Sequence, residues 1–177
     1  MPRPEALEVP MNAEQSRAVV DVLTRSIEQE AVATRKVISA VPNDNRDYKP
    51  DPKSRSAWEL AVHLAMGDIW FADSILKGAF EWKGDPPTPP EMTDPTAVAS
   101  WHETHLTDRL AKLRAMTPEQ MLQPIEFFGT TAPAAVWLTM LNNHAIHHRG
   151  QLAAYLRAAG SKCPAIYGMS ADENLFA

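Results

Sequence analysis

The chain has 177 residues, a mass of 19.6 kDa and 45% hydrophobic residues, which supply enough apolar surface for one sizeable core. The 22 acidic residues outnumber the 17 basic ones, and the resulting net charge of -5 excludes a basic surface that would attract nucleic acid. The single cysteine, Cys163, excludes an internal disulfide and a cysteine-rich zinc cluster. The 6 histidines are more informative, because they are unevenly placed.

Two segments bear on where the protein resides. The first ten residues, MPRPEALEVP, lack the apolar segment of a secretory signal, so we expect a cytoplasmic protein. Residues 127–148 contain no Asp, Glu, Lys or Arg and are long enough to span a bilayer. The same stretch contains Pro133, two asparagines and three histidines, whose polar groups would be costly in lipid. It therefore predicts a buried helix and no membrane span.

The first predicted helix covers residues 12–41. Asn12 suits the N-cap position, and Pro42 followed by a polar run ends the helix. Residues 48–52 are too rich in proline for a helix and predict an extended connection. The apolar residues of the helix recur every three or four positions and form one stripe: Val20, Leu23, Ile27, Ala31, Ile38 and Val41.

The second predicted helix begins at Ser56. The hydroxyl of Ser56 and the side chain of Glu59, three residues later, match a capping box. Apolar residues then surround the helix on most sides, which is typical of a central helix. After Phe80, residues 84–90 include one glycine and four prolines and predict a stiff surface connection.

Two more helices follow in the chain. Asp94 and Pro95 supply an N-cap and a first-turn proline for the third helix. Pro133 lies near the start of the fourth helix, which continues through Tyr155 to Gly160, a residue suited to a left-handed helix end.

The segment between these two helices has a mixed pattern. Residues 117–120 predict a short helical turn, whereas residues 125–128 are ambiguous and compatible with an extended segment. Four helical stretches joined by loops, with no convincing strand pattern, predict an all-α bundle. We divide the chain into an N-terminal extension, residues 1–12, and a single helical bundle domain, residues 13–177.

Two histidines on the fourth helix share one face. At about 100° per residue, His144 and His148 lie about 40° apart and one turn from each other. An i, i+4 pair of imidazoles can direct two nitrogens at one ion, which binds them in their neutral form. By itself this pair leaves metal binding and ordinary helix chemistry as equal alternatives.

A third imidazole is available on the second helix. His63 lies on the face that carries Leu60, Met66 and Trp70. In an antiparallel bundle this face can meet the last helix, and three imidazoles would leave an open coordination position for water or substrate. A single histidine on an apolar helix is more often a hydrogen-bonded core residue, so this alternative stays open for His63.

The other histidines have simpler interpretations. His147 lies about 60° from His144 on the opposite side and is predicted at the edge of the stripe, although an i, i+3 pairing with His144 remains a geometric alternative. His102, on the apolar stripe of the third helix, is either a fourth ligand or a core histidine, and we favour the core histidine. His105 points elsewhere and is predicted to be solvated.

The second and fourth helices together resemble the DinB superfamily of metal-dependent bundle proteins. The resemblance rests on residues 56–63, SAWELAVH, and residues 144–152, HAIHHRGQL. The tail at residues 163–173, CPAIYGMSADE, is also similar to a common ending in that group. The combined pattern is fairly specific and extends from near Ala13 to the C-terminus.

This resemblance implies a four-helix bundle with a long crossover connection, often a homodimer, and a three-histidine site for a divalent metal. Carried onto this sequence, the ligands are His63, His144 and His148, the residues that helix phase also favours. Zinc, nickel and iron all accept neutral imidazole, so the donor set does not choose among them. The family name gives no evidence for DNA binding.

An ion held by three neutral histidines keeps its charge uncompensated and should lower the pKa of a bound water or thiol. Some relatives resemble this arrangement and use low-molecular-weight thiols in S-transfer or isomerisation. We therefore expect a metal-dependent enzyme of thiol S-transferase or hydrolase-like type acting on a small molecule. The alternative is a non-catalytic, stress-associated metal-binding or interaction protein.

Residues near the predicted ligands have less specific roles. Glu59, one turn before His63, is a candidate general base, although the capping box already explains it. Cys163 is interpreted as a packed or surface thiol, so thiol chemistry would need a cosubstrate thiol. Arg149 lies about 140° from His144 and predicts a salt bridge or subunit contact away from the metal.

Overall fold

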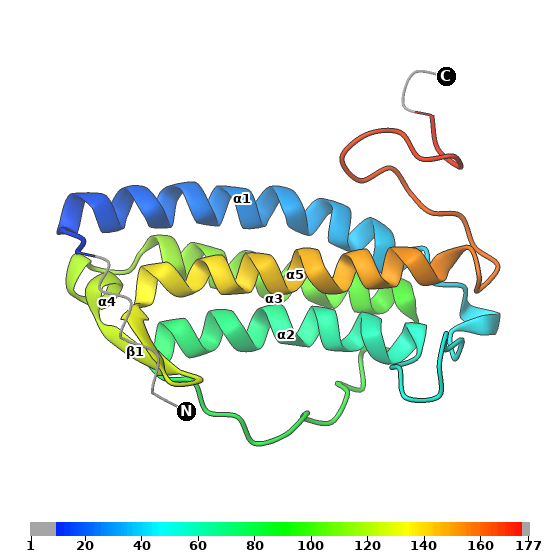
Figure 1. Cartoon of the computed structure of the whole chain (residues 1–177), viewed down its shortest axis with the longest axis horizontal. Helices are drawn as coiled ribbons and strands as arrows, with labels where there is room; N and C mark the ends of the chain where they lie inside the picture. Colours follow the sequence, from blue (N-terminus) through cyan, green and yellow to red (C-terminus); the bar gives the residue numbers. More distant parts are fainter. Residues whose placement is uncertain (1–9, 175–177) are drawn as a thin grey trace.

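Four long helices dominate the fold in the computed structural model, which describes residues 10–174 (Figure 1). The long helices are α1 (Ala13–Ser39), α2 (Ala57–Lys77), α3 (Pro95–Arg114) and α5 (Ala134–Leu156). The short elements are η1 (Asn43–Asn45), α4 (Pro118–Leu122), β1 (Pro124–Phe127) and β2 (Thr130–Pro133). The predicted all-α bundle is confirmed, while residues 1–9 of the predicted extension and residues 175–177 lie outside the described part.

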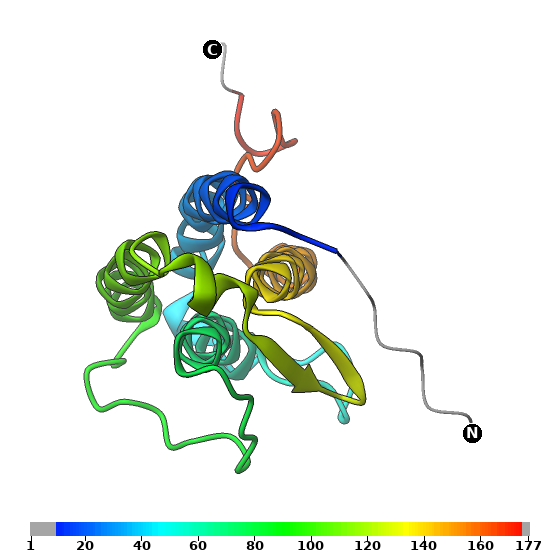
Figure 2. The ribbon, with the colours of Figure 1, turned by 90° about the vertical axis from the view of Figure 1, so that its left-hand side faces the viewer.

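The order of the helices in space differs from their order in the chain. α1 packs against α3 and α5, and α2 packs against the same two helices, so α1 and α2 lie diagonally across the bundle (Figure 2). α2 and α3 run in the same direction, because residues 78–94 return along the length of the bundle between them (Figure 1). This return is the predicted long crossover connection.

Side-chain caps fix the starts of three of the four long helices, α1, α2 and α3. The side chains of Asn12 and Asp94 accept the hydrogen bonds that begin α1 and α3, as predicted. Ser56 and Glu59 form the predicted capping box, in which the Ser56 hydroxyl accepts from the Glu59 N–H and the Glu59 carboxylate accepts from the Ser56 N–H. α2 ends at Gly78, whose φ of 77° is left-handed.

A β-hairpin replaces the ambiguous segment before α5. β1 and β2 are antiparallel, and Phe127 pairs with Thr130 across a two-residue turn. Phe128 and Gly129 have φ values of 49° and 79°, and positive φ at both central positions is the pattern of a type I′ turn. The hairpin folds back beside the start of α5, where the Trp137 indole N–H donates to the Ile125 carbonyl at 3.1 Å.

The helix C-termini are the least accurate part of the prediction. α1 ends at Ser39, before the predicted limit at residue 41, and α5 ends at Leu156, before Gly160. Gly160 has the left-handed φ expected of it, 93°, but it lies in the turn that follows the helix. Such shifts of a few residues are ordinary at helix ends, where the last turn loosens.

A polar layer crosses the bundle between two apolar groups. One group of buried apolar residues surrounds the hairpin end of the bundle, and the other surrounds the N-terminal half of α2 and the C-terminal half of α5. Asp68, His102 and His144 lie where the two groups meet, each on a different long helix. Asp68 and His102 are fully enclosed, with exposed fractions of 1% and 0%.

Within residues 10–174, no helix combines the length and the apolar character that a membrane crossing needs. Residues 127–148, whose composition raises that question, form part of the hairpin and the first two-thirds of α5. A Cβ added to Gly150 on α5 would have no heavy atom within 4 Å among the described residues. Gly150 is therefore not required for a close contact between helices within residues 10–174.

Candidate metal centre

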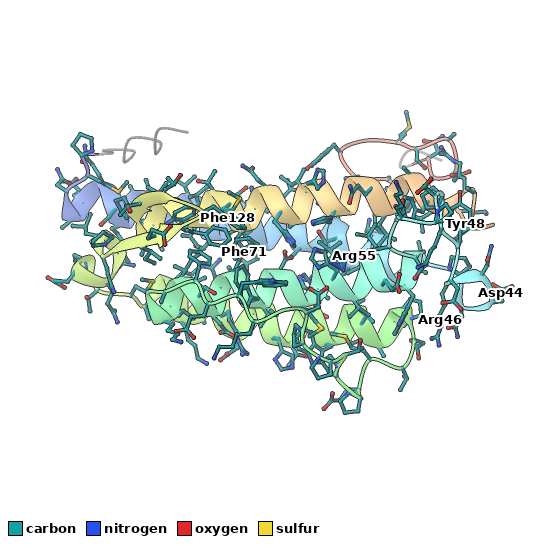
Figure 3. The ribbon with its side chains drawn as sticks, turned by 60° about the horizontal axis from the view of Figure 1, so that its bottom comes forward. Asp44, Arg46, Tyr48, Arg55, Phe71 and Phe128 are labelled. Atoms are coloured by element: carbon teal, nitrogen blue, oxygen red, sulfur yellow. The ribbon has the colours of Figure 1, made fainter. Side chains whose placement is uncertain are left out.

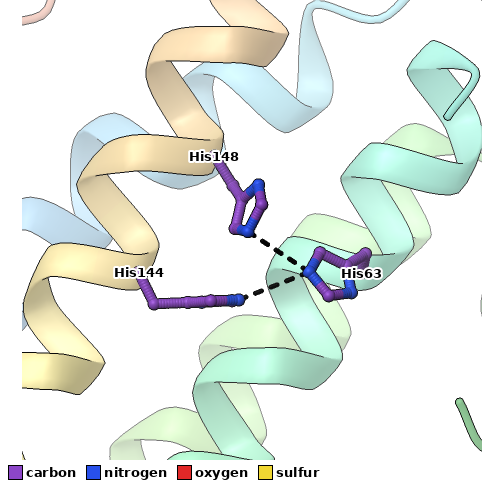
Figure 4. A group of neighbouring side chains, drawn as sticks. All are labelled: His63, His144 and His148. Atoms are coloured by element: carbon purple, nitrogen blue, oxygen red, sulfur yellow. Dashed lines mark hydrogen bonds between the residues drawn. The ribbon is translucent and has the colours of Figure 1, made fainter. Parts of the chain in front are cut away.

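Three imidazoles converge between α2 and α5. His63 comes from α2, and His144 and His148 come from successive turns of α5 (Figure 4). The His63 Nε2 lies 3.3 Å from the His148 Nε2 and 3.4 Å from the His144 Nε2. Each of the three side chains offers one nitrogen to a cluster whose atoms all lie within 4.8 Å of one another. The structure therefore brings together the three histidines that the sequence predicts.

The nitrogen separations match the size of a small metal site. A tetrahedral ion with metal–nitrogen bonds of about 2.0–2.1 Å separates its ligand nitrogens by about 3.3–3.4 Å. The two separations that involve His63, 3.3 and 3.4 Å, fall in this range. The side chains are half-buried, as expected for a site with protein on one side and an opening on the other. The residues fit a divalent metal ion.

Asp68 fixes the orientation of His144. The Nδ1 of His144 lies 3.4 Å from the Asp68 Oδ1, and the other carboxylate oxygen lies 3.0 Å from the Nε2 of His102. A carboxylate accepts hydrogen bonds, so His144 carries its proton on Nδ1 and presents an Nε2 lone pair to the cluster. Such a carboxylate contact is the usual support of a metal-binding histidine.

His102 serves this layer as a hydrogen-bond donor to Asp68. Its Nδ1 is buried without a hydrogen-bond partner in residues 10–174. An unpaired buried lone pair costs less than an unpaired N–H, so a neutral ring with its proton on Nε2 fits the observed contacts. Burial raises the pKa of Asp68, but the hydrogen bonds from His102 and His144 outweigh this effect and the net pKa lies below its ordinary value. His102 is thus the core histidine that we favoured, connected to His144 of the cluster by two hydrogen bonds through Asp68.

The other two ligand candidates are held in the neutral form that metal binding requires. Burial lowers the pKa of His63 to about 4, and the nearby Arg55 guanidinium acts in the same direction. Burial also lowers the pKa of His148, whose Nδ1 lies 2.8 Å from the Gln151 Oε1. The amide oxygen accepts from Nδ1–H, which leaves the His148 Nε2 free to face the His63 Nε2.

Gly67 makes room for the cluster. A Cβ at this position would lie 2.4 Å from the Cε1 and 3.0 Å from the Nε2 of His144. Any side chain larger than hydrogen would therefore displace the His144 ring. Gly67 is one turn after His63 on α2, so the same helix supplies both a ligand candidate and the gap for its neighbour.

The cluster opens onto a cavity of about 670 Å³. Its walls come from α2 and α5, the loop before α2, the crossover connection and the hairpin. This volume lies within the usual range of small-molecule sites. The three imidazoles are accessible from this space, which distinguishes them from a sealed structural ion site.

Glu59 lines the cavity, but its carboxylate is already engaged. It accepts from the Ser56 N–H at 2.7 Å and from the Lys49 ammonium at 3.0 Å. These two contacts hold the pKa of Glu59 below its ordinary value, away from the range of an effective general base at neutral pH. A catalytic role of Glu59 stays a prediction.

The remaining residues that the sequence analysis named lie away from the cluster. His147 contacts the cluster only through the ring of His148, 4.9 Å away between centroids. His105 stacks on Trp101 at 4.1 Å on the outer part of α3. The Arg149 guanidinium is buried and pairs with Glu30 of α1 at 2.6 Å, which confirms the predicted salt bridge. Cys163 is half-buried in the tail.

Sequence reasoning missed Asp68. A signal was present, because Asp68 is a carboxylate on the face of α2 that also carries Leu64, Ala65 and Ile75. A charged side chain in the middle of an apolar helix face needs a buried partner, and that requirement could have directed attention to the histidines of neighbouring helices.

Two curated bacterial proteins are similar to this chain over most of its length. The uncharacterized protein YjoA of Bacillus subtilis is 29% identical over 133 residues, which are 72% of this chain and 82% of YjoA. The uncharacterized protein YrdA of the same species is 28% identical over 158 residues, 87% of this chain and 91% of YrdA.

Solved structures show the same fold. The crystal structure of the DinB-like protein YjoA matches with a TM-score of 0.64 and 26% identity, over 80% of this chain and 94% of YjoA. A DinB-like protein from Bacillus cereus matches with a TM-score of 0.68 and 22% identity, over 83% of this chain and 97% of that one. The sequence profile of the DinB family matches residues 11–174, and the chain belongs to this family.

Proposed function

We propose that the chain binds one divalent metal ion through His63, His144 and His148 and is a metal-dependent enzyme of thiol S-transferase or hydrolase-like type. One observation carries this proposal: three imidazoles converge on one point at the wall of an accessible cavity. A divalent ion bound there would lower the pKa of a coordinated water or thiol.

The chain's own groups prepare this site. Asp68 sets the proton of His144 on Nδ1, and Gln151 does the same for His148. Neutral imidazole ligands add no charge of their own, and Asp68, the carboxylate that contacts His144, is enclosed by protein and does not line the cavity. An ion held in this way keeps its positive charge available to an anionic nucleophile.

A thiol nucleophile would come from outside the chain. The one cysteine, Cys163, lies in the tail and does not line the cavity. A cosubstrate thiol that enters the cavity would reach the three imidazoles directly, with the small-molecule acceptor in the remaining space. Zinc, nickel and iron are all compatible with this donor set.

A turnover assay tests the enzyme class. The metal-loaded protein is incubated with bacillithiol, mycothiol or glutathione and an electrophilic acceptor, and separately with ester and amide substrates, while product is followed by mass spectrometry. We expect turnover that His144→Ala abolishes and His147→Ala preserves. Full metal occupancy without turnover across both panels would overturn the enzyme assignment and favour the non-catalytic alternative. A cytoplasmic homodimer stays a prediction from the sequence.

A further inference from the structure

The cavity has two chemically different ends, one on each side of the imidazoles. Along α2, Glu59 precedes His63 by one turn, and Trp70 follows it by two turns. At 1.5 Å per residue these positions lie about 6 Å before and about 10 Å after His63. Figure 3 shows the same polarity, with Phe71 and Phe128 toward the hairpin end and Arg55 farther along the bundle. A ligand that fills the cavity must pass the histidine cluster.

The end near the hairpin is aromatic. The ring of Trp70 lies 5.5 Å from that of Trp82 and 5.8 Å from that of Phe127, and Phe127 lies 4.2 Å from Phe128. Trp82 is 59% exposed and Phe128 is 87% exposed, so the bundle core does not need these two rings. They line the cavity from the crossover connection and from the hairpin turn.

The turn itself presents the Phe128 ring at some conformational cost. Phe128 adopts a φ of 49°, a left-handed conformation that bulky residues rarely adopt and that Asn or Gly would accept more easily. A large apolar side chain at a strained, exposed position is unfavourable for folding alone. Its position on the cavity wall is consistent with contact to a ligand.

The opposite end carries an excess of positive charge. The Lys49 ammonium pairs with Glu59 at 3.0 Å, and the Arg55 guanidinium pairs with Asp85 at 3.2 Å. The ammonium of Lys53, which also lines the cavity, has no acidic partner among residues 10–174. Three cations and two anions therefore line this end of the cavity, and the neighbouring Asp51 carboxylate accepts from the Lys53 backbone N–H at 2.8 Å. The local field favours an anionic ligand group.

We propose that the cavity takes a small organic anion with a flat apolar group. The flat group packs against Trp82 and Phe128, the anionic group lies near Lys53 and Arg55, and the atoms between them pass the three imidazoles. The volume of about 670 Å³ suits a ligand of this kind. This inference names the class of ligand for the proposed function, and its catalytic meaning rests on that function.

Calorimetric titration with three matched compounds tests the ligand class. 4-(2-Naphthyl)butane-1-sulfonate carries the ring and the charge on a spacer long enough to reach both ends, 4-(2-naphthyl)butan-1-ol carries the ring alone, and butane-1-sulfonate carries the charge alone. A sulfonate is a poor metal ligand, so the anion reports on the protein cations. The full chain is titrated as purified and again after chelator treatment. We expect 4-(2-naphthyl)butane-1-sulfonate to bind at least ten-fold more tightly than either partial compound in both states.

Two variants test which part of the ligand binds at each end of the cavity. Lys53→Gln should weaken the binding of 4-(2-naphthyl)butane-1-sulfonate by about two- to five-fold and leave the binding of 4-(2-naphthyl)butan-1-ol unchanged, because only a solvent-exposed charge contact is lost. Phe128→Asn, which suits the left-handed turn, should weaken both ring compounds by about two- to ten-fold. Lys162→Gln and Val22→Asn, at exposed positions outside the cavity, are the matched controls.

Several outcomes would overturn the inference. Equal binding of the three compounds, or equal effects of the cavity variants and their controls, would show that the two ends do not select the ligand. Sedimentation analysis adds a second criterion: if Phe128→Asn changes self-association and not ligand affinity, the exposed rings serve a contact with a second copy. Metal content, measured on the same samples, separates these failures from a failure of the proposed metal site.

Discussion

The His144 ring lies directly against the backbone of Gly67. A Cβ on Gly67 would lie 2.4 Å from the His144 Cε1, a distance that no real contact allows. The same ring lies 3.4 Å from the carboxylate of Asp68, on the next residue of α2. α2 thus positions His144 twice, by leaving space at one residue and by accepting a hydrogen bond at the following one.

Gly67→Ala should displace the His144 ring and weaken divalent metal binding by about ten-fold or more, as for the loss of other groups that orient ligands. A competition titration with a chromophoric chelator measures the affinity. Gly150→Ala is the matched control on α5, where a Cβ meets open space, and it should gain about 0.5–1 kcal/mol of stability from helix propensity. Equal metal affinity in the two variants would contradict this steric account.

Asp68→Asn should reduce metal affinity by about 10- to 100-fold, because the amide is a weaker acceptor for the His144 and His102 N–H groups. Asp73→Asn is the matched control. Asp73 lies on α2 like Asp68, but its side chain is half-exposed and pairs with Arg109 of α3 at 3.0 Å. That surface ion pair contributes about 1 kcal/mol or less to the unfolding free energy. Metal titration combined with urea unfolding distinguishes the two positions, and similar results for both would remove the orienting role of Asp68.

The pKa of His63 predicts how the stability of the metal-free protein depends on pH. The folded pKa is about 4, below the ordinary histidine value of 6.5, so between these values the unfolded chain binds a proton that the folded chain does not. The unfolding free energy should therefore fall as pH decreases from about 6.5 to about 4 and then lose no more from this group. His148, whose pKa is also lowered, adds to the same decline.

Urea unfolding of chelator-treated protein across this range provides the measurement. The decline should be shallower in His63→Gln than in the parent protein. Asp68 contributes in a separate window, because its lowered pKa makes its stabilisation disappear only below the ordinary value of 3.8. A His63→Gln profile parallel to that of the parent would show that His63 is not held neutral by burial.

A buried ion pair fastens the tail to the bundle. The Arg149 guanidinium on α5 pairs with the Glu30 carboxylate of α1 at 2.6 Å and donates to the Tyr167 hydroxyl, which itself donates to Glu30 at 2.8 Å. Arg149 is 1% exposed, so it cannot turn to water when its partner is lost.

Glu30→Ala should lower the unfolding free energy by about 3–5 kcal/mol, because it leaves the Arg149 charge buried and unpaired. Arg149→Met removes the buried charge and fills part of its space, so it should cost less than Glu30→Ala. Tyr167→Phe loses both hydrogen bonds of the hydroxyl and should lower the unfolding free energy by about 1–2 kcal/mol. Urea unfolding gives the order of the three, and a larger loss for Arg149→Met than for Glu30→Ala would refute the argument.

The helices and the shared face of His144 and His148 could be predicted because both follow from local periodicity, whereas the resemblance to the DinB superfamily joined His63 to this pair. The spacing of His144 and His148 by four residues fixes their common face on any helix, and the apolar surroundings of His63 direct it inward. The caps at Asn12 and Ser56 were predictable for the same reason, because a cap depends on residues three positions apart.

The features that the sequence did not reveal depend on chain segments that are far apart. The Asp68–His102 contact and the Glu30–Arg149 contact each join different helices, and helix phase alone does not say which helices are neighbours. The hairpin is difficult for another reason. Each of its strands has four residues including a proline, and its turn places Phe128 where Asn or Asp would be typical.

Metal stoichiometry tests the central claim most directly. The full chain is reconstituted with Zn²⁺, freed of excess metal by gel filtration, and analysed by inductively coupled plasma mass spectrometry. The parent protein and His147→Ala should retain one ion per chain, whereas His63→Ala, His144→Ala and His148→Ala should lose it while circular dichroism shows that the helices persist. Retention of the ion by folded His63→Ala, His144→Ala and His148→Ala, or a metal-free parent protein, would contradict the three-histidine site.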